Sequence, residues 1–301
     1  MHLHAKGIYR LLDCSVRRGV LPMNARVVVV FPVYNGAATL RESLQSIKDQ
    51  DLSDFRAIVL NNCSTDKTLQ VAQRFCEEDA RFSIISNATH LSAEDNFAKA
   101  IKLGAETAEY FCLRAADDLS SRNFLKKLVE ALDADDAKLL AACPTKSFNT
   151  KGFKLKHPAA NIFSFQESYA KGRVPRNLTF PSEWIYGMFR SRSVDILMAR
   201  WHELGNPWGV ASYVLSEFVV RDLVAYVPDP TFDFREGSGS EQKYGAKGFR
   251  DKLSQRLRYT LGCYRLVDKL PPAGLLTKAK FFRMCWNDAR RKTRYKLLWI
   301  F

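Results

Sequence analysis

Two adjacent acids near the middle of this 301-residue chain are the residues most suited to hold a metal ion. Asp117 and Asp118 follow an apolar segment at 110–114. Hard cations such as Mg²⁺ and Mn²⁺ prefer carboxylate oxygens, with phosphate and water completing the shell. We therefore predict a Mg²⁺ or Mn²⁺ site with Asp118 as the main ligand, supported by Asp117. The alternative is that both acids only cap a helix beginning near Ser120.

Two further polar clusters follow apolar segments in the same way. Tyr34 and Asn35 come after the segment 27–33, and residues 61–66 come after the segment 55–60. In a parallel sheet the carboxyl ends of the strands share one edge, and ligands bind there. The three clusters are therefore expected to form one site.

The elements that would position these clusters alternate between strand and helix. Runs rich in β-branched residues predict strands, and apolar residues at helical spacing predict helices between them. The expected strands are 27–33, 55–60, 82–85, 110–114 and 139–143, and the expected helices are 37–50, 64–77, 93–107 and 120–132. This alternation predicts an α/β fold with a Rossmann-like, mostly parallel sheet flanked by helices.

The second half of the chain has a different pattern. Residues 146–182 are polar and interrupted by glycine and proline, so they are expected to be loop-like. A helix at 212–222 and a strand at 224–227 follow. We divide the chain into an N-terminal extension, two halves of one globular unit, and a basic helical tail. Their expected bounds are 1–24, 25–145, 146–240 and 241–301.

The composition excludes several other classes of protein. The seven cysteines form no C-x-x-C pair and the five histidines form no cluster, which argues against a zinc site and indicates reduced thiols in a cytoplasmic protein. No segment has the length of a membrane span or the pattern of a signal peptide. A dinucleotide-binding enzyme is also excluded, because it needs G-x-G-x-x-G after the first strand and the segment 31–36 contains only one glycine.

The C-terminal tail carries most of the positive charge. Residues 241–301 contain sixteen Lys and Arg against four acids, although the whole chain has a net charge of +14. Apolar residues at helical spacing form a stripe on the segment 249–264. We expect this tail to lie on an anionic membrane, with its Phe, Trp and Leu side chains dipping in. No nucleic acid is expected, because no nucleic-acid-binding motif is present; a solvated helical face is the other alternative.

Five segments together resemble a known family. Val28 to Gly36, with the sequence V-V-V-F-P-V-Y-N-G, is similar to the opening strand and loop of family-2 glycosyltransferases with the GT-A fold. The others, in the order of that family, are 64–68, 116–118, 184–190 and 234–238. The resemblance covers roughly residues 26–240. It implies an enzyme that moves a sugar from a nucleotide-diphosphate donor to an acceptor hydroxyl, with inversion and with a divalent metal.

The resemblance also implies which residues bind the nucleotide-sugar. These are Pro32, Tyr34, Asn35, Asn61, Asn62, Asn96, Asp117 and Arg235, with Lys243 as a second cation for the diphosphate. Asn61 stands where the family commonly has an aspartate, and Asp66 is expected to be a structural cap. The acceptor is expected to be a glycan or a lipid-linked sugar, in the synthesis of a surface glycan or glycolipid at the inner face of the membrane.

The catalytic base is the least defined of these positions. An inverting transfer needs a carboxylate to take the proton of the acceptor hydroxyl. Ser212 stands where the family often has this aspartate, so Glu217, one turn farther on, is the candidate, with Glu183 and Asp222 behind it. Because Ala116 and Asn61 also replace usual acids, the alternative is a catalytically inactive nucleotide-sugar or glycan-binding protein on the same fold.

Overall fold

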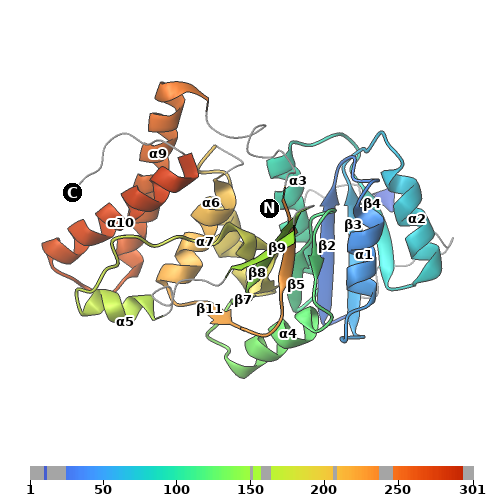
Figure 1. The fold of residues 1–301 in the computed structure, drawn as a ribbon, viewed down its shortest axis with the longest axis horizontal. Coiled ribbons are helices and arrows are strands. Elements are labelled where there is room, and N and C mark those ends of the chain that lie inside the picture. The colour runs from blue at the N-terminus through green and yellow to red at the C-terminus, as the bar shows by residue number, and fades with distance from the viewer. Residues whose placement is uncertain are drawn as a thin grey trace, which may run out of the picture.

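The centre of the computed structural model is an eight-stranded, mostly parallel sheet (Figure 1). The structure describes residues 10–11, 25–149, 152–156, 164–205, 209–236 and 247–293. In spatial order the strands are β1 (Arg10–Leu11), β4 (Phe82–Ser86), β3 (Phe55–Asn61), β2 (Val27–Val33), β5 (Tyr110–Leu113), β10 (Met188–Arg190), β7 (Leu140–Ala142) and β11 (Val224–Tyr226). Only β1 and β10 run antiparallel to their neighbours. The predicted α/β fold with a mostly parallel sheet is confirmed.

Helices cover both faces of this sheet. They are α1 (Leu40–Lys48), α2 (Thr68–Glu78), α3 (Ala93–Thr107), α4 (Phe124–Ala134), α5 (Phe165–Ala170), α6 (Val194–Trp201), α7 (Val210–Val220), α9 (Gly248–Tyr264) and α10 (Leu275–Thr293). Short 3₁₀ helices lie at η2 (Ser182–Tyr186), η3 (Ser191–Ser193) and η4 (Arg265–Lys269). Every strand and helix expected before residue 143 is present, with ends shifted by a few residues.

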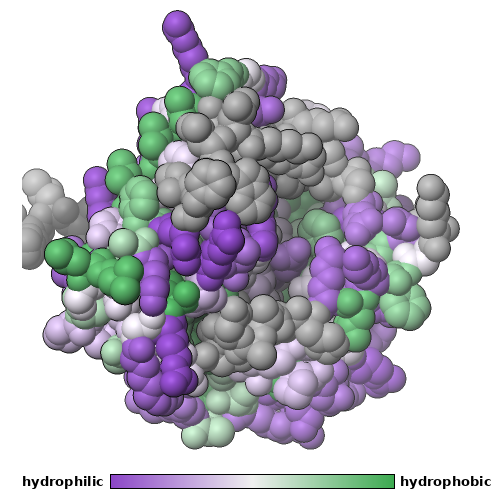
Figure 2. All heavy atoms as spheres, turned by 60° about the vertical axis from the view of Figure 1, so that its left-hand side comes forward, coloured by the Kyte–Doolittle hydropathy of each residue, from purple (hydrophilic) through white to green (hydrophobic). Residues whose placement is uncertain are grey.

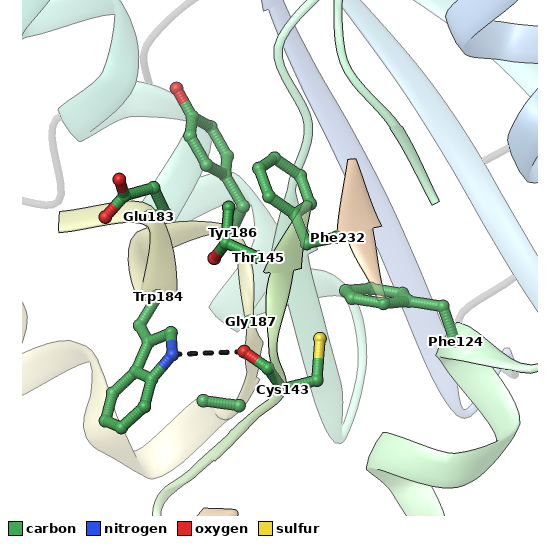
Figure 3. Close-up of a pocket in the computed structure, with 9 residues that line it drawn as sticks. Phe124, Cys143, Thr145, Glu183, Trp184, Tyr186, Gly187 and Phe232 are labelled. Carbon is green, nitrogen blue, oxygen red and sulfur yellow. Dashed lines mark hydrogen bonds between the residues drawn. The ribbon is translucent and has the colours of Figure 1, made fainter. Parts of the chain in front are cut away.

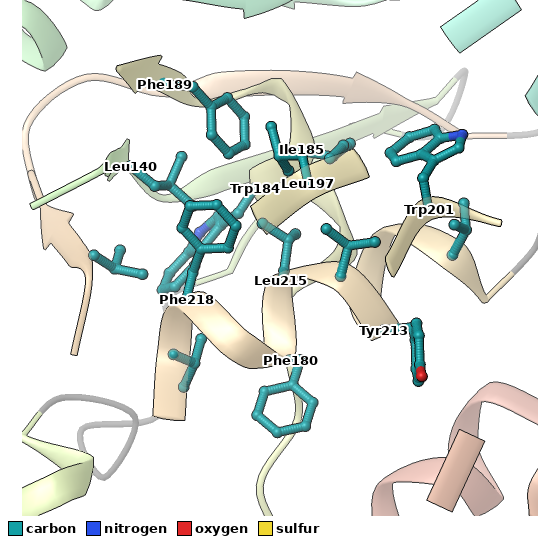
Figure 4. Close-up of a cluster of buried hydrophobic side chains, with 14 of the residues drawn as sticks. Leu140, Phe180, Trp184, Ile185, Phe189, Leu197, Trp201, Tyr213, Leu215 and Phe218 are labelled. Carbon is teal, nitrogen blue, oxygen red and sulfur yellow. The ribbon is translucent and has the colours of Figure 1, made fainter. Parts of the chain in front are cut away.

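Alternation along β2 divides the core into two layers. Val28 and Val30 pack in the cluster that includes α3, α6 and α7, whereas Val29 and Phe31 pack in the cluster that includes α1, α2 and α4. Side chains of a strand point alternately to its two faces, so a strand buried on both faces must be apolar throughout. Figure 4 shows the first layer at α7, where Phe218 lies beside Leu140 and near Phe189.

A second sheet, which the sequence did not predict, bridges the two halves of the chain. Its order is β6 (Leu119–Ser120), β12 (Phe232–Arg235), β8 (Thr145–Asn149) and β9 (Gly152–Lys156). The expectation that 146–182 is loop-like was wrong at β8 and β9, and also at α5. All five residues of β9 are exposed. Phe153 and Leu155 alternate with lysines there, but the run is only five residues long and its partner β8 is mostly polar, so the hairpin gives a weak strand signal.

The basic tail folds back on the body of the protein as two helices that contact each other. Figure 1 shows α9 and α10 at the end of the molecule opposite α1 and α2. Phe281 and Trp286 on α10 are buried, so they are not available to dip into a membrane as expected. Residues 294–301, including the last aromatic residues of the tail, lie outside the described part of the chain. Within the described ranges no helix combines the length and apolar character that a membrane span requires.

Candidate active site

The loops after β2 and β3 are joined by side-chain hydrogen bonds. The Asn35 side-chain oxygen Oδ1 accepts a bond from the Thr65 backbone N–H at 2.8 Å, and the Asn35 backbone N–H donates to Ser64 Oγ at 3.0 Å. Asp66 accepts from the N–H groups of Ala37 and Thr68, at the starts of both following helices. Asp66 is therefore the structural anchor that the sequence predicted, and Asn35 serves to fix the loop.

The loop after β4 is held by a buried chain of amides. Asn87 donates to the side-chain oxygens of Asn62 at 2.8 Å and Asn96 at 2.9 Å. The Asn62 side chain also bonds both the N–H and the carbonyl of Leu91. Because these amides bond to one another, Asn62 and Asn96 shape the loop instead of presenting their side chains to a ligand.

Three other predicted nucleotide residues lie along the same edge. Pro32 is buried within β2, opposite Leu60. Asn61 is 5% exposed, and its side-chain oxygen accepts from the Ser64 N–H at 3.1 Å. Tyr34 is 46% exposed and lies against the ring of His90, with the centroids 4.4 Å apart. Tyr34 and His90 thus form an aromatic rim, and the sequence analysis missed His90.

The acidic loop after β5 touches the first of these loops. A Cβ added to Gly36 would lie 3.0 Å from the Ala116 Cβ, so only a residue without a side chain lets the two loops approach this closely. Ser43 Oγ of α1 donates to the backbone oxygens of Ala115 and Asp118 at 2.9 and 2.7 Å. The three polar clusters therefore share one edge of the sheet.

Asp118 is a buried carboxylate with one oxygen unbonded. Its side chain is 1% exposed; Oδ1 accepts from the Arg235 N–H at 2.9 Å, whereas Oδ2 has no partner among the described residues. Burial, followed by repulsion from Asp117, raises the pKa of Asp118 to about 7. Burial also raises the pKa of Asp117. Buried acids of this kind are more stable when a cation compensates their charge.

Arg235 of β12 lies directly beside the two acids. Its Nε donates to the Asp117 backbone oxygen at 3.0 Å, its Nη2 reaches Glu42 at 2.6 Å, and its guanidinium lies over Phe148 at 4.7 Å. The structure thus brings Asp117, Asp118 and Arg235 together. Lys243, the other predicted cation, falls outside the described residues.

Arg114 is a buried cation that the sequence analysis missed. It is fully buried at the end of β5, its guanidinium lies 4.9 Å from the ring centroids of both Phe124 and Phe232, and its Nη1 donates to the Leu119 carbonyl at 3.0 Å. Its positive charge favours the ionised form of Asp118. A charged residue ending an otherwise apolar strand was the available signal.

A small pocket beside the acids contains a third carboxylate. Figure 3 shows Glu183 on one side of Tyr186 and Phe232 on the other, with Thr145 next to Tyr186. The Tyr186 ring stacks on Phe232 at 5.0 Å. Burial raises the pKa of Tyr186, and the charges of Asp118, Asp117 and Glu183 raise it further, which places the tyrosine near all three acids.

Glu217, the predicted base, lies in a different environment. It is 1% exposed and forms ion pairs with Arg221 at 2.9 Å and Lys269 at 2.6 Å. It lies near the end of α7. Shortly after this helix, the Leu223 backbone oxygen accepts hydrogen bonds from the N–H groups of Leu139 and Leu140, at the amino end of β7. Since Asp118 follows the carboxyl end of β5, Glu217 is directed to the opposite edge of the sheet and its geometry does not support the predicted role.

Asp222, the other candidate near α7, is bonded elsewhere, and Ser212 stands at the position where the family often has the base. Asp222 accepts hydrogen bonds from the N–H groups of Phe165 and Gln166, at the start of α5. Ser212 is buried in the first turn of α7, and its hydroxyl has no partner among the described side chains and backbone. Neither residue therefore supplies a carboxylate to the edge where Asp118 lies.

Comparison with known proteins places the chain in a family. The family model described as glycosyl transferase family 2 matches residues 28–197, which is more than half of the chain. The protein belongs to glycosyl transferase family 2. Within this family-2 chain, residues 28–197 include the three loops, both acids and Glu183.

Curated relatives match a shorter stretch. An uncharacterized glycosyltransferase of Haemophilus influenzae is 33% identical over 110 residues, which is 36% of this chain and 33% of that protein. The putative glycosyltransferase EpsE of Bacillus subtilis is 32% identical over 111 residues, 36% of this chain and 38% of EpsE. The match thus spans about a third of the length of these relatives.

Solved structures of low sequence identity share the fold of this family-2 protein. S. aureus TarS 1–349 in complex with UDP-GlcNAc has a TM-score of 0.63 at 15% identity, covering 90% of this chain and 74% of that one. The mannosyltransferase PcManGT from Pyrobaculum calidifontis, in complex with GDP-Man and Mn²⁺, has a TM-score of 0.52 at 17% identity, covering 94% and 73%. These structures confirm the GT-A fold.

The acidic loop of the family-2 chain has a donor set suited to Mg²⁺ or Mn²⁺. The unbonded, buried Oδ2 of Asp118 and the neighbouring Asp117 provide hard oxygen ligands. In the described ranges no group of three or more His, Cys, Asp and Glu side chains is placed to hold a metal. Two carboxylates leave room for phosphate oxygens and water in the remaining positions.

Proposed function

We propose that this protein is a metal-dependent, inverting glycosyltransferase that moves a sugar from a nucleotide-diphosphate donor to an acceptor hydroxyl. The observation that carries the proposal is the buried Asp118 carboxylate with its unbonded oxygen, at the sheet edge where the other polar loops meet. The neighbours in complex with UDP-GlcNAc and GDP-Man support a nucleotide-sugar donor.

The donor is positioned by the loops after β2, β3 and β4. Tyr34 and His90 form the exposed rim on which the base or ribose packs. The hydrogen bonds of Asn35, Asp66 and Asn87 hold these loops before the donor arrives. A preorganised site loses little conformational entropy on binding, so these residues affect donor affinity indirectly.

The diphosphate lies between the acids and Arg235. Asp118 and Asp117 would hold Mg²⁺ or Mn²⁺, which would neutralise the charge of the leaving diphosphate. The Arg235 guanidinium, now bonded to Glu42, is within reach of the same position and is proposed to bind a diphosphate oxygen. Both contributions strengthen as negative charge develops on the leaving group, which is the condition for catalysis.

We propose Glu183 as the base in place of Glu217. Glu183 lines the pocket beside Tyr186 and the two acids, and Ser182 Oγ lies 3.1 Å from its carboxylate. The acceptor oxygen attacks the anomeric carbon, its proton passes to Glu183, and the bond from that carbon to the diphosphate oxygen breaks. Attack from the side opposite the leaving group gives inversion.

The acceptor is proposed to be a glycan or a lipid-linked sugar, in the synthesis of a surface glycan or glycolipid on the cytoplasmic side of a membrane. Tyr186, stacked on Phe232, offers an aromatic face beside Glu183 on which a sugar ring can pack.

The test is nucleotide binding followed by turnover. Thermal denaturation of the full chain is measured with UDP, GDP and dTDP, each with and without Mn²⁺, and then donor hydrolysis is measured for the matching nucleotide-sugars. Stabilisation by one nucleotide that requires Mn²⁺, together with hydrolysis, supports the enzyme. Nucleotide binding with no turnover of any donor or acceptor would instead support the inactive binding protein.

A further inference from the structure

Large exposed apolar side chains concentrate on the C-terminal helices. Of the eight such residues within the described ranges, five lie on α9 and α10. Leu257 and Leu261 are 42% and 50% exposed on α9, and Leu275 and Leu276 are 87% and 71% exposed at the start of α10. Figure 2 shows hydrophobic side chains along one margin of the face that these helices turn forward. Leucines this exposed have no role in the core.

The opposite sides of α9 and α10 pack against the rest of the protein. Tyr259 and Cys263 of α9, and Phe281 and Met284 of α10, are buried. The two helices also pack against each other and α9 packs against α7. The four exposed leucines therefore cannot turn inward without exposing an equal apolar face, and they stay on the surface of the folded protein.

Cations surround these leucines. Residues 247–293 contain thirteen Lys and Arg and three acids. Arg250 and Arg258 on α9 and Arg265 at the start of η4 are exposed, and none of them forms an ion pair with an acid among the described residues. Asp288, one of the three acids, is buried and bonded to Tyr259 at 2.6 Å. The outer face thus combines positive charge with exposed leucine.

We propose that this basic hairpin surface (Leu257, Leu261, Leu275 and Leu276 with Arg250, Arg258 and Arg265) docks on an anionic phospholipid bilayer. The leucines enter the boundary between headgroups and acyl chains, and the arginines bind the lipid phosphates. A second copy of the chain is disfavoured because two such basic faces repel each other. Nucleic acid is disfavoured because it would leave the leucines in water. The proposal does not depend on sugar transfer.

Vesicle cosedimentation of the full chain tests this docking. The vesicles are phosphatidylcholine alone, or phosphatidylcholine mixed with phosphatidylglycerol. Binding is expected only to the anionic vesicles and is expected to weaken as salt is raised. The double substitution Leu275→Glu with Leu276→Glu is expected to weaken binding by about tenfold or more. Arg258→Glu with Arg265→Glu is expected to do the same.

Matched controls replace exposed residues elsewhere. Phe153→Glu alters an apolar side chain that is 70% exposed on β9, and Lys102→Glu removes an exposed cation on α3; both variants are expected to bind anionic vesicles like the wild type. Absence of binding to anionic vesicles at low salt would overturn the proposal. Undiminished vesicle binding by the Leu275→Glu, Leu276→Glu variant would also overturn it. Binding to duplex DNA would overturn it too, if the arginine variant loses that binding and the leucine variant keeps it.

Discussion

The donor loops and the acidic loop lie on one edge of the sheet, yet they differ in how their polar groups are satisfied. The Asn87 amide N–H groups donate to Asn62 and Asn96, although the Asn87 side-chain oxygen has no partner among the described residues, and Asn35 is bonded on both sides of its amide. Asp118, equally buried, keeps one carboxylate oxygen unbonded. Groups that bond internally hold a shape, whereas a buried charge without a partner is stabilised by binding something. The difference separates residues that build the site from residues that act in it.

Removing the unbonded carboxylate should have the largest effect. Asp118→Asn keeps the size of the side chain but removes the charge that holds the cation, and is expected to lower kcat/KM for sugar transfer by about a thousandfold or more. Steady-state kinetics with saturating Mn²⁺ measure this. Asp66→Asn is the control for the loop network and is expected to act mainly on stability. Activity of Asp118→Asn within tenfold of the wild type would remove the metal proposal.

Steady-state kinetics also distinguish the two candidate bases, Glu183 and Glu217. Glu183→Gln is expected to lower kcat by about a hundredfold to a thousandfold, because the acceptor proton loses its acceptor. Glu217→Gln is expected to leave kcat nearly unchanged and to lower the free energy of unfolding by about 1–2 kcal/mol through its ion pairs with Arg221 and Lys269. The opposite pattern would restore Glu217 as the base.

Acid should compete with the cation at Asp118. Its pKa of about 7 in the folded protein lies above that of an ordinary carboxyl group, so below pH 7 the site holds a proton that the cation must displace. Mn²⁺ affinity in the presence of the nucleotide is expected to fall about tenfold per pH unit below 7 and to level off above it. Folding stability in the metal-free protein depends on pH in the opposite direction. The Asp118 carboxyl group stabilises the fold at acid pH, and that contribution is lost as the pH rises toward 7. Calorimetric titration across this range, with Asp118→Asn as control, measures the first effect.

Removing the hydrogen bonds of Asn87 should lower the stability of the fold more than it lowers the rate of sugar transfer. Asn87→Ala removes the donor shared by Asn62 and Asn96 and is expected to lower the free energy of unfolding by about 1–3 kcal/mol. Urea denaturation measures this, with the exposed Thr89→Ala as control. A large fall in kcat without any change in stability would show that the amides contact the substrate after all.

The sequence predicted the parallel sheet because β2 and β3 are apolar at every buried position except Asn61, as expected for strands buried on both faces. The position of the acids and loops at one edge of this sheet was predicted from the common direction of the parallel strands. β8 and β9 were not predicted, because β8 is mostly polar and the alternation of Phe153 and Leu155 with lysines in β9 is short. The prediction of Glu217, which the geometry does not support, has a similar gap: spacing along a helix places a residue on a face, but does not say which edge of the sheet that part of the helix approaches.

Arg114 also bears on the order in which the site would be assembled. Its fixed positive charge and that of Arg235 offset the two carboxylates only in part, because Arg235 is also paired with Glu42, so a bare divalent ion meets a pocket of small net negative charge. A cation already complexed to a diphosphate brings its own negative charge and meets favourable partners in Arg235 as well as the acids. The free ion should therefore bind weakly, and metal and donor should enter together as one complex.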